Sequence, residues 1–119
     1  MTRRIVIKNM ALATTGFLLA SLVASPARGQ EAKQLYEETC APCHGVSGKG
    51  DGPAGQVLQP KPADFAIVLQ GKDDAYIAKV IDEGGAGVGK SPIMPSYQGV
   101  FSDEQIQGLV QYLKELSLK

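Results

Sequence analysis

The feature that most constrains this chain is the pentapeptide Cys-Ala-Pro-Cys-His at residues 40–44. Its two thiols lie three positions apart, so each can add to one of two vinyl groups on neighbouring edges of a porphyrin. The histidine that follows at once then lies under the metal, where an imidazole nitrogen can bind it. This spacing predicts a covalent attachment site for one c-type haem.

A Cys-x-x-Cys pair alone is ambiguous, because it also occurs in zinc sites and in redox-active dithiols. Cys40 and Cys43 are the only cysteines of the chain, and His44 is its only histidine. A four-ligand zinc site would therefore have to recruit carboxylates, and no second imidazole exists for zinc or for a bis-histidine haem. A thioredoxin-like dithiol needs a strand before it, and no strand-like alternation precedes Cys40. Haem attachment is favoured, with zinc and dithiol chemistry as the alternatives.

The N-terminal residues 1–29 have the pattern of a cleaved secretory signal peptide. Arg3, Arg4 and Lys8 precede a run of roughly fifteen mostly apolar residues, which small residues follow. That run is shorter than the roughly 20 residues that a helix needs to cross a bilayer, so an uncleaved anchor is the less favoured alternative. Cleavage after Ala27 and cleavage after Gly29 both fit the small-residue rule.

The two adjacent arginines also resemble a twin-arginine export signal. We favour the general secretion route, because covalent haem is added after export and no prefolded protein needs to be moved. Both routes deliver residues 30–119 to the same compartment. The sequence therefore predicts one periplasmic domain, with no permanent membrane span once the signal is removed.

Removing the signal changes the charge of the chain. Residues 1–29 hold four of the 12 basic residues and none of the 12 acidic ones, which leaves eight basic against 12 acidic residues from Gln30 onward. Nucleic-acid binding depends on neutralising phosphates with Lys and Arg, so an acidic domain of this size is a poor candidate for it. Complementary charge instead favours transient docking with a partner that carries a basic patch, mainly by raising the encounter rate.

Three helices are predicted after the signal. The first spans residues 31–40, has an apolar-leaning face and ends in the Cys-x-x-Cys-His motif. The second follows Asp73 as its cap and stops after about Glu83 at two glycines. The last begins with the capping-box pattern of residues 102–105 and carries an apolar stripe over four turns.

Two loops rich in glycine and proline connect these helices. In residues 45–55 the glycines would let backbone approach a haem closely, and the apolar residues 63–69 can line a pocket. The second loop, residues 84–100, has Met94 at its centre, the only methionine beyond the signal. A thioether is a soft, neutral ligand for haem iron, and His/Met ligation raises the reduction potential. The alternative is that Met94 fills a gap in the core, which fits less well because no helical face includes it.

The order of a helix, the Cys-x-x-Cys-His motif, a Gly/Pro loop, a middle helix, a Met-Pro loop and an amphipathic last helix resembles a class I c-type cytochrome. The resemblance covers residues 31–117 and extends to small bacterial monohaem proteins and to the cytochrome domains of respiratory complexes. It implies an all-α cytochrome c fold, with three main helices plus loops wrapped around one covalently bound haem. It also implies that the first and last helices cross, with Tyr36 facing Leu109 and Tyr112.

The same resemblance implies the residues that hold haem c and its iron. Cys40 and Cys43 would form the thioethers, His44 would bind the iron on one side of the haem, and Met94 would bind it on the other. His44 would be oriented by a hydrogen bond to the carbonyl of Pro53, a contact that fixes the tautomer of the imidazole.

The loop after the motif departs from the family's pattern, because Pro60 and Pro62 follow Pro53 closely. Because of these additional prolines, it stays open which proline carbonyl accepts the hydrogen bond from His44. Lys61 and Tyr97 are the candidates for contacts with the haem propionates.

The function that the resemblance implies is one-electron transfer between redox proteins, with both axial positions of the haem iron filled by the protein. Filled ligation leaves no position for a substrate, so we expect an electron carrier and not an enzyme. Two alternatives remain open. The protein is a haem enzyme or gas sensor if Met94 is not a stable ligand, or it is a subunit of a larger dehydrogenase or oxidase complex.

Overall fold

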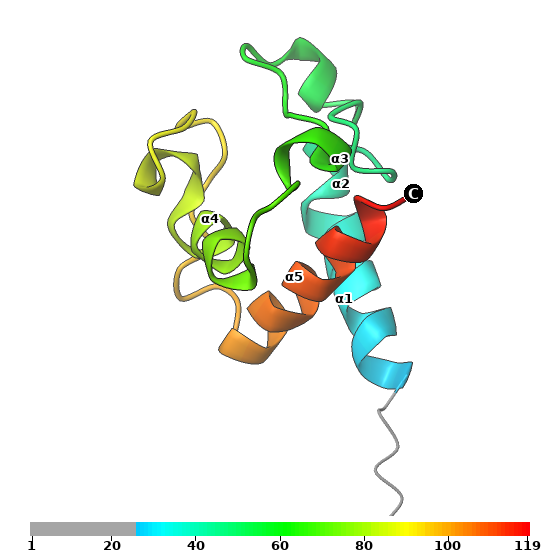
Figure 1. Ribbon diagram of the computed structural model, residues 1–119. Helices are drawn as coiled ribbons and strands as arrows, with labels where there is room; N and C mark the ends of the chain where they lie inside the picture. Colours follow the sequence, from blue (N-terminus) through cyan, green and yellow to red (C-terminus); the bar gives the residue numbers. More distant parts are fainter. Residues whose placement is uncertain (1–25) are drawn as a thin grey trace, which may run out of the picture.

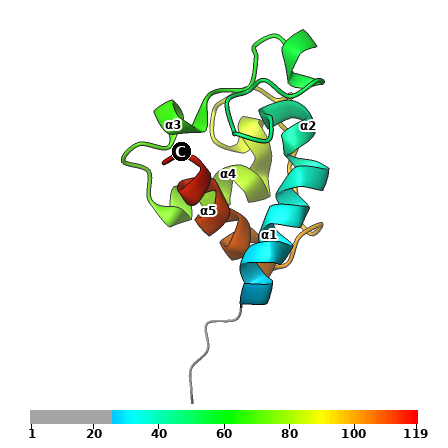
Figure 2. The same ribbon diagram turned by 90° about the vertical axis from the view of Figure 1, so that its right-hand side faces the viewer.

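A computed structural model describes residues 26–119, and over this range the chain is helical and contains no β-strand. Its elements, in order, are α1 (Pro26–Thr39), α2 (Ala41–His44), the short 3-10 helix η1 (Gly55–Val57), α3 (Phe65–Val68), α4 (Asp74–Gly87) and α5 (Asp103–Leu116). Helix α1 runs on into α2 and crosses α5, and α4 packs on α5 from another side (Figures 1 and 2). The predicted all-α fold is confirmed. Most of the predicted signal peptide, residues 1–25, lies outside the described residues.

Helix α1 begins at Pro26, five positions before the predicted start at Glu31. Proline suits the first position of a helix, because its missing N–H would have no partner there. Residues 27–31 are exposed, so this first part of the helix adds little to the core. The predicted domain boundary after Gly29 falls inside α1. Within residues 26–119, no helix combines the length and the apolar character required to cross a membrane.

The core forms where α1 crosses α5. Tyr36, Leu109 and Val110 are its largest fully buried side chains, each of which contributes roughly 1.5–3 kcal/mol by its removal from water. The ring of Tyr36 lies 5.3 Å from that of Tyr112, centroid to centroid. Its hydroxyl donates a hydrogen bond of 2.6 Å to the carbonyl of Gly45, directly after the Cys-x-x-Cys-His motif. The predicted crossing of the first and last helices is confirmed. The hydrogen bond from Tyr36 links this core to the Cys-x-x-Cys-His motif.

The predicted caps of the two later helices are confirmed. The Asp73 side chain accepts a hydrogen bond from the Tyr76 amide at 2.7 Å and so begins α4. Ser102 and Gln105 form both bonds of a capping box at the start of α5. The predicted stripe of α5 is buried and consists of Ile106, Leu109, Val110, Leu113 and Leu116.

The predicted stop after Glu83 is confirmed for the regular part of α4, because Gly84 has the non-helical conformation φ 71° and ψ −177°. The helix extends past this break for one further turn, to Gly87. The short elements η1 and α3 were not predicted, because three or four residues are too few for a periodic pattern to be recognised. Asp64 starts α3 by accepting a hydrogen bond from the Ala66 amide at 2.8 Å.

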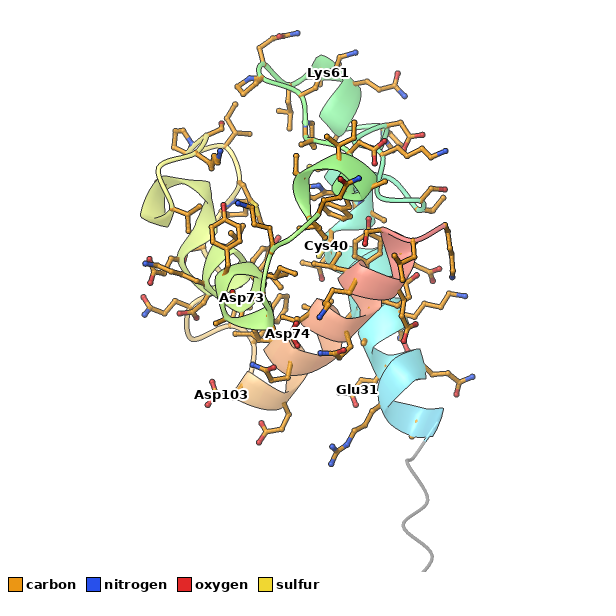
Figure 3. All side chains as sticks on the ribbon, in the orientation of Figure 1. Glu31, Cys40, Lys61, Asp73, Asp74 and Asp103 are labelled. Carbon is orange, nitrogen blue, oxygen red and sulfur yellow. The ribbon has the colours of Figure 1, made fainter. Side chains whose placement is uncertain are left out.

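Asp74 links α4 to α5 (Figure 3). Its carboxylate accepts hydrogen bonds from Nζ of Lys114 and, at 2.8 Å, from Nε2 of Gln111. The bond from Lys114, and then that from Gln111, holds the pKa of Asp74 below its usual value. A carboxyl whose pKa is lower in the folded than in the unfolded chain stabilises the fold above the unfolded pKa of about 3.9. That contribution is lost as the pH falls through the lower, folded value.

We therefore expect Asp74→Asn to lower the stability of the haem-loaded protein at pH 7, and the difference from the unaltered protein to shrink below about pH 4. Denaturant unfolding at pH 7 and pH 3, followed by circular dichroism, measures this. Asp82→Asn is the control, because the Asp82 carboxylate has no hydrogen bond or ion pair within residues 26–119. A stability loss in Asp74→Asn that does not depend on pH would contradict the view that the charged Asp74 carboxylate stabilises the fold through its bonds to Lys114 and Gln111.

Candidate functional site

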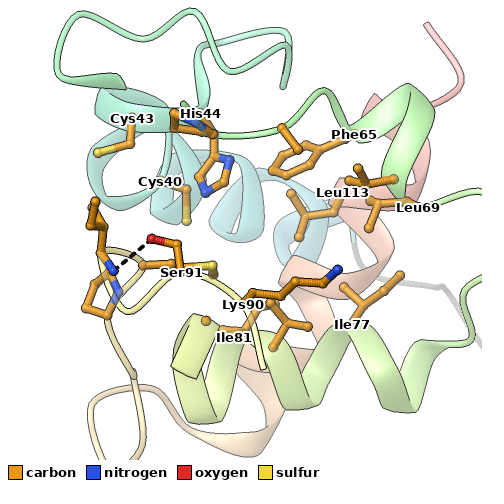
Figure 4. A pocket seen from close by; sticks show the side chains of 18 of the residues that line it. Cys40, Cys43, His44, Phe65, Leu69, Ile77, Ile81, Lys90, Ser91 and Leu113 are labelled. Carbon is orange, nitrogen blue, oxygen red and sulfur yellow. Dashed lines mark hydrogen bonds between the residues drawn. The ribbon is translucent and has the colours of Figure 1, made fainter. Parts of the chain in front are cut away.

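A pocket of about 490 Å³ separates α2 and α3 from α4 and has α5 at its base (Figure 4). Cofactor sites generally measure roughly 300–1,000 Å³, so this volume suits a large organic group. Apolar side chains form most of its wall, among them Phe65, Leu69, Ile77, Ile81 and Leu113. Phe65 and Leu69 come from the predicted pocket-lining segment 63–69.

The Cys-x-x-Cys-His motif forms one turn of helix on the wall of this pocket. The His44 amide donates to the Cys40 carbonyl at 2.8 Å, so the motif has helical geometry. Residues three and four positions apart share a helix face, which directs Cys40, Cys43 and His44 to the same side. All three line the pocket, and both thiols are half-buried and free of a disulfide.

The glycine-rich loop holds this turn in place from outside. The Gly50 amide donates to the His44 carbonyl at 2.8 Å, and the Ala54 amide donates to the Pro42 carbonyl at 2.9 Å. A Cβ atom on Gly52 would overlap the Pro42 carbonyl, so only glycine permits this approach. We expected these glycines to bring backbone towards a haem. They bring it against the helix of the motif instead.

The His44 imidazole points into the pocket and stacks on Phe65, with the ring centroids 4.8 Å apart and the planes inclined by 27° (Figure 4). Burial lowers the pKa of His44, which favours the neutral imidazole that binds metals. Its Nδ1 is buried and has no hydrogen-bond partner among the described residues. The exposed Pro53 is therefore not brought to this nitrogen, and the contact between the two stays a prediction.

Met94 lies in the same pocket, half-buried, on the loop that follows α4. The fold thus gathers four predicted site residues, Cys40, Cys43, His44 and Met94, from two distant segments. Two thiols, a neutral imidazole, a thioether and apolar walls are the groups that a covalently bound haem requires. The residues present therefore fit the group that the motif predicts.

Sequence reasoning missed several other residues of the pocket. Phe65 was predicted only as part of an apolar segment, and its contact with His44 depends on the tertiary fold. Lys72 and Lys90 line the pocket together with the predicted Lys61 and Tyr97. The Lys72 ammonium lies 4.8 Å from the centre of the Tyr76 ring. No pattern in the sequence distinguishes these lysines from other surface lysines.

The zinc and dithiol alternatives gain no support from the geometry. In the part of the chain that the structure describes, no group of three or more His, Cys, Asp or Glu side chains could hold a metal ion. Burial, and to a smaller extent the neighbouring Cys43, raises the pKa of Cys40 to about 11. Redox-active thiols have lowered pKa values, so the raised pKa of Cys40 does not favour dithiol redox chemistry.

The chain is similar to known proteins over almost all of this domain. The family model described as Cytochrome c matches residues 29–117. The Cbb3-type cytochrome c oxidase subunit FixP of Bradyrhizobium diazoefficiens is 31% identical over 115 residues, which are 93% of this chain and 37% of that subunit. The Cbb3-type cytochrome c oxidase subunit CcoP of Azospirillum brasilense is 31% identical over 90 residues, 76% of this chain and 29% of that subunit.

The match is partial on the relatives' side, since this chain spans about a third of the length of each. The family match, in contrast, includes the motif, the Met94 loop, most of α1 and the whole of α4 and α5. It agrees with the helical fold and with the pocket described above. The chain therefore belongs to the cytochrome c family, with covalently bound haem c and its iron as cofactor and haem-based electron transfer as its chemistry.

Proposed function

We propose that this protein is a periplasmic carrier of single electrons, in which Cys40 and Cys43 hold the haem by thioethers and His44 and Met94 bind its iron. One observation carries the proposal: a single apolar pocket is lined by both thiols, the imidazole and the thioether. When bound, haem iron supplies the reversible exchange of one electron between its Fe(II) and Fe(III) states. The basic and apolar pattern of residues 1–29 supports export.

The residues of the pocket suit electron transfer better than catalysis on a substrate. Burial keeps His44 neutral, and the Phe65 ring restricts the rotation of the imidazole by stacking on its face. Apolar walls limit the access of water, which together with the ligands sets the reduction potential. If His44 and Met94 both held the iron, no ligand position would be left for a substrate, so we propose that the protein is not an enzyme.

A redox titration tests the proposal. The haem-loaded protein should follow a reversible one-electron curve, with about 59 mV for each tenfold change in the ratio of oxidised to reduced form. It should not consume oxygen or peroxide catalytically. Turnover of either oxidant would favour the enzyme alternative.

The relatives favour a second candidate, in which this cytochrome c domain works as part of an oxidase complex. Both relatives are named as subunits of cbb3-type cytochrome c oxidases. Fractionation separates the two candidates: a freely diffusing carrier is released with the periplasmic contents, whereas an oxidase component co-purifies with the enzyme from solubilised membranes.

The surface around the pocket suggests the kind of partner. Lys61, Lys72 and Lys90 line the pocket and are exposed, and none of the described residues that line it is acidic. Val68 and Ile93 also line it and keep 41% and 43% of their surfaces exposed. A basic rim with an apolar centre suits a partner with an acidic docking surface. This local charge is opposite to the net charge from which we predicted a basic partner.

Small redox reagents can measure this local charge. We expect Lys72→Glu to slow oxidation of the reduced protein by the anion ferricyanide up to about tenfold at low ionic strength, and to accelerate oxidation by a cationic cobalt complex. Lys49→Glu makes the same charge change on an exposed residue outside the pocket and is the control. Stopped-flow absorbance gives the rates. Equal effects of the two substitutions would mean that the pocket edge is not the site of exchange.

A further inference from the structure

The interruption of α4 redirects the hydrogen bonds of the helix. In a regular α-helix the Gly85 amide would donate to the carbonyl four residues earlier, that of Ile81. Because Gly84 has φ 71°, the helix breaks, and the Gly85 amide donates to the Met94 carbonyl at 3.1 Å. One backbone bond of α4 is thus exchanged for a bond to Met94 itself.

The carbonyl groups left free on the other side of the break also bind the Met94 loop. The Tyr97 amide donates to the carbonyls of Ile81 and Asp82, at 3.2 and 3.1 Å. The Ser96 hydroxyl donates to the Asp82 carbonyl at 2.6 Å. Ser96 and Tyr97, which follow Pro95, are therefore tied to the last regular turn before the break, and Met94, which precedes Pro95, is tied to Gly85 just after it.

The two glycines leave space for this attachment. A Cβ atom on Gly84 would lie 2.7 Å from the carbonyl carbon of Pro95 and from the amide nitrogen of Ser96. A Cβ atom on Gly85 would overlap the Ser91 carbonyl. Both glycines are buried against the loop. The broken part of α4 and the Met94 loop therefore fit together in shape as well as through hydrogen bonds.

We propose that Gly84 and Ser96 are positioning residues, which dock the loop on the broken end of α4 and so keep the Met94 thioether within the pocket. The inference rests on the proposed ligation by Met94. A flexible loop loses conformational entropy when it is ordered, and a ligand on such a loop binds in proportion to the time it spends in place. A loop that is already docked would keep Met94 in place as a ligand of the iron. A loop that detaches would leave that ligand position free for another molecule.

Two pairs of variants test this in the haem-loaded protein. Gly84→Ala introduces both backbone strain and the clash with the loop. Gly71→Ala also places a side chain at a positive φ, 69°, but at a position where a Cβ atom would meet nothing within 4 Å. Ser96→Ala removes the hydroxyl bonded to Asp82, whereas Ser96→Thr retains a hydroxyl.

We expect Gly84→Ala to lose the far-red methionine-to-iron band of the oxidised protein and to bind carbon monoxide when reduced, while Gly71→Ala keeps the band. Ser96→Ala should bind carbon monoxide about five- to tenfold faster than the unaltered protein, and Ser96→Thr should behave like the unaltered protein. Thermal unfolding of each variant separates lost stability from lost ligation.

A Gly84→Ala protein that keeps its far-red band and excludes carbon monoxide would overturn the inference. If that variant does not fold, unchanged carbon monoxide binding in Ser96→Ala would overturn it. Failure of the proposed function is a different result, because the unaltered protein would then lack the band itself.

Discussion

Replacing Cys40 and Cys43 together by serine is expected to give a chain that retains no haem under denaturing conditions and does not fold cooperatively. The thiols are the only groups of the chain that can form thioethers. Without the cofactor, the apolar wall of a pocket of about 490 Å³ is left facing water. Each Å² of apolar surface that stays in water forfeits roughly 25 cal/mol of stabilisation, and the whole stability of a typical domain is only about 5–15 kcal/mol.

Haem staining after denaturing electrophoresis measures the covalent link, and circular dichroism during heating measures the folding. The single variant Cys40→Ser is the matched control, because its remaining thiol should keep haem attached in part of the molecules. A double variant that unfolds cooperatively near the unaltered protein would contradict the view that the cofactor completes the core.

Replacing Met94 by alanine should produce the second largest effect. The oxidised protein should lose its far-red band, and the reduced protein should bind carbon monoxide at the vacated position. A thioether favours Fe(II), so the reduction potential should fall. If Met94 binds Fe(II) about a hundredfold more tightly than Fe(III), the fall is about 120 mV, since each tenfold preference corresponds to about 59 mV.

The control for Met94→Ala is Ile93→Ala, on the preceding residue of the same loop. Ile93 also lines the pocket and is 43% exposed, so its truncation alters the loop without removing a ligand. A Met94→Ala protein with an unchanged potential and no affinity for carbon monoxide would assign the axial position to another group. Optical redox titration of both variants makes the comparison.

The sequence predicts those parts of the fold that depend on near neighbours. Asp73 and the Ser102–Gln105 pair cap their helices as their spacing indicates, because these bonds span only three residues. The apolar stripe of α5 likewise follows from a local period. Cys40, Cys43 and His44 meet in one pocket because a single helical turn brings positions three and four apart to one face.

The features that sequence reasoning missed depend on residues far apart in the chain. Gly84 marks the end of the regular helix by its residue type, but the hydrogen bonds between this break and the loop around Met94 join residues that are far apart in the sequence. Phe65 reaches His44 only after α3 folds over the motif. The lysines at the pocket come from three separate segments, so the net charge of the chain does not indicate the local charge there.

The absorption spectrum of the unaltered protein, produced together with the machinery that attaches haem, tests the central claim most directly. We expect sharp low-spin bands in the reduced protein, a weak far-red band in the oxidised protein, and no change when carbon monoxide is added to the reduced form. A high-spin spectrum that shifts with carbon monoxide would contradict ligation by both His44 and Met94, and it would favour catalysis or gas sensing over electron carriage.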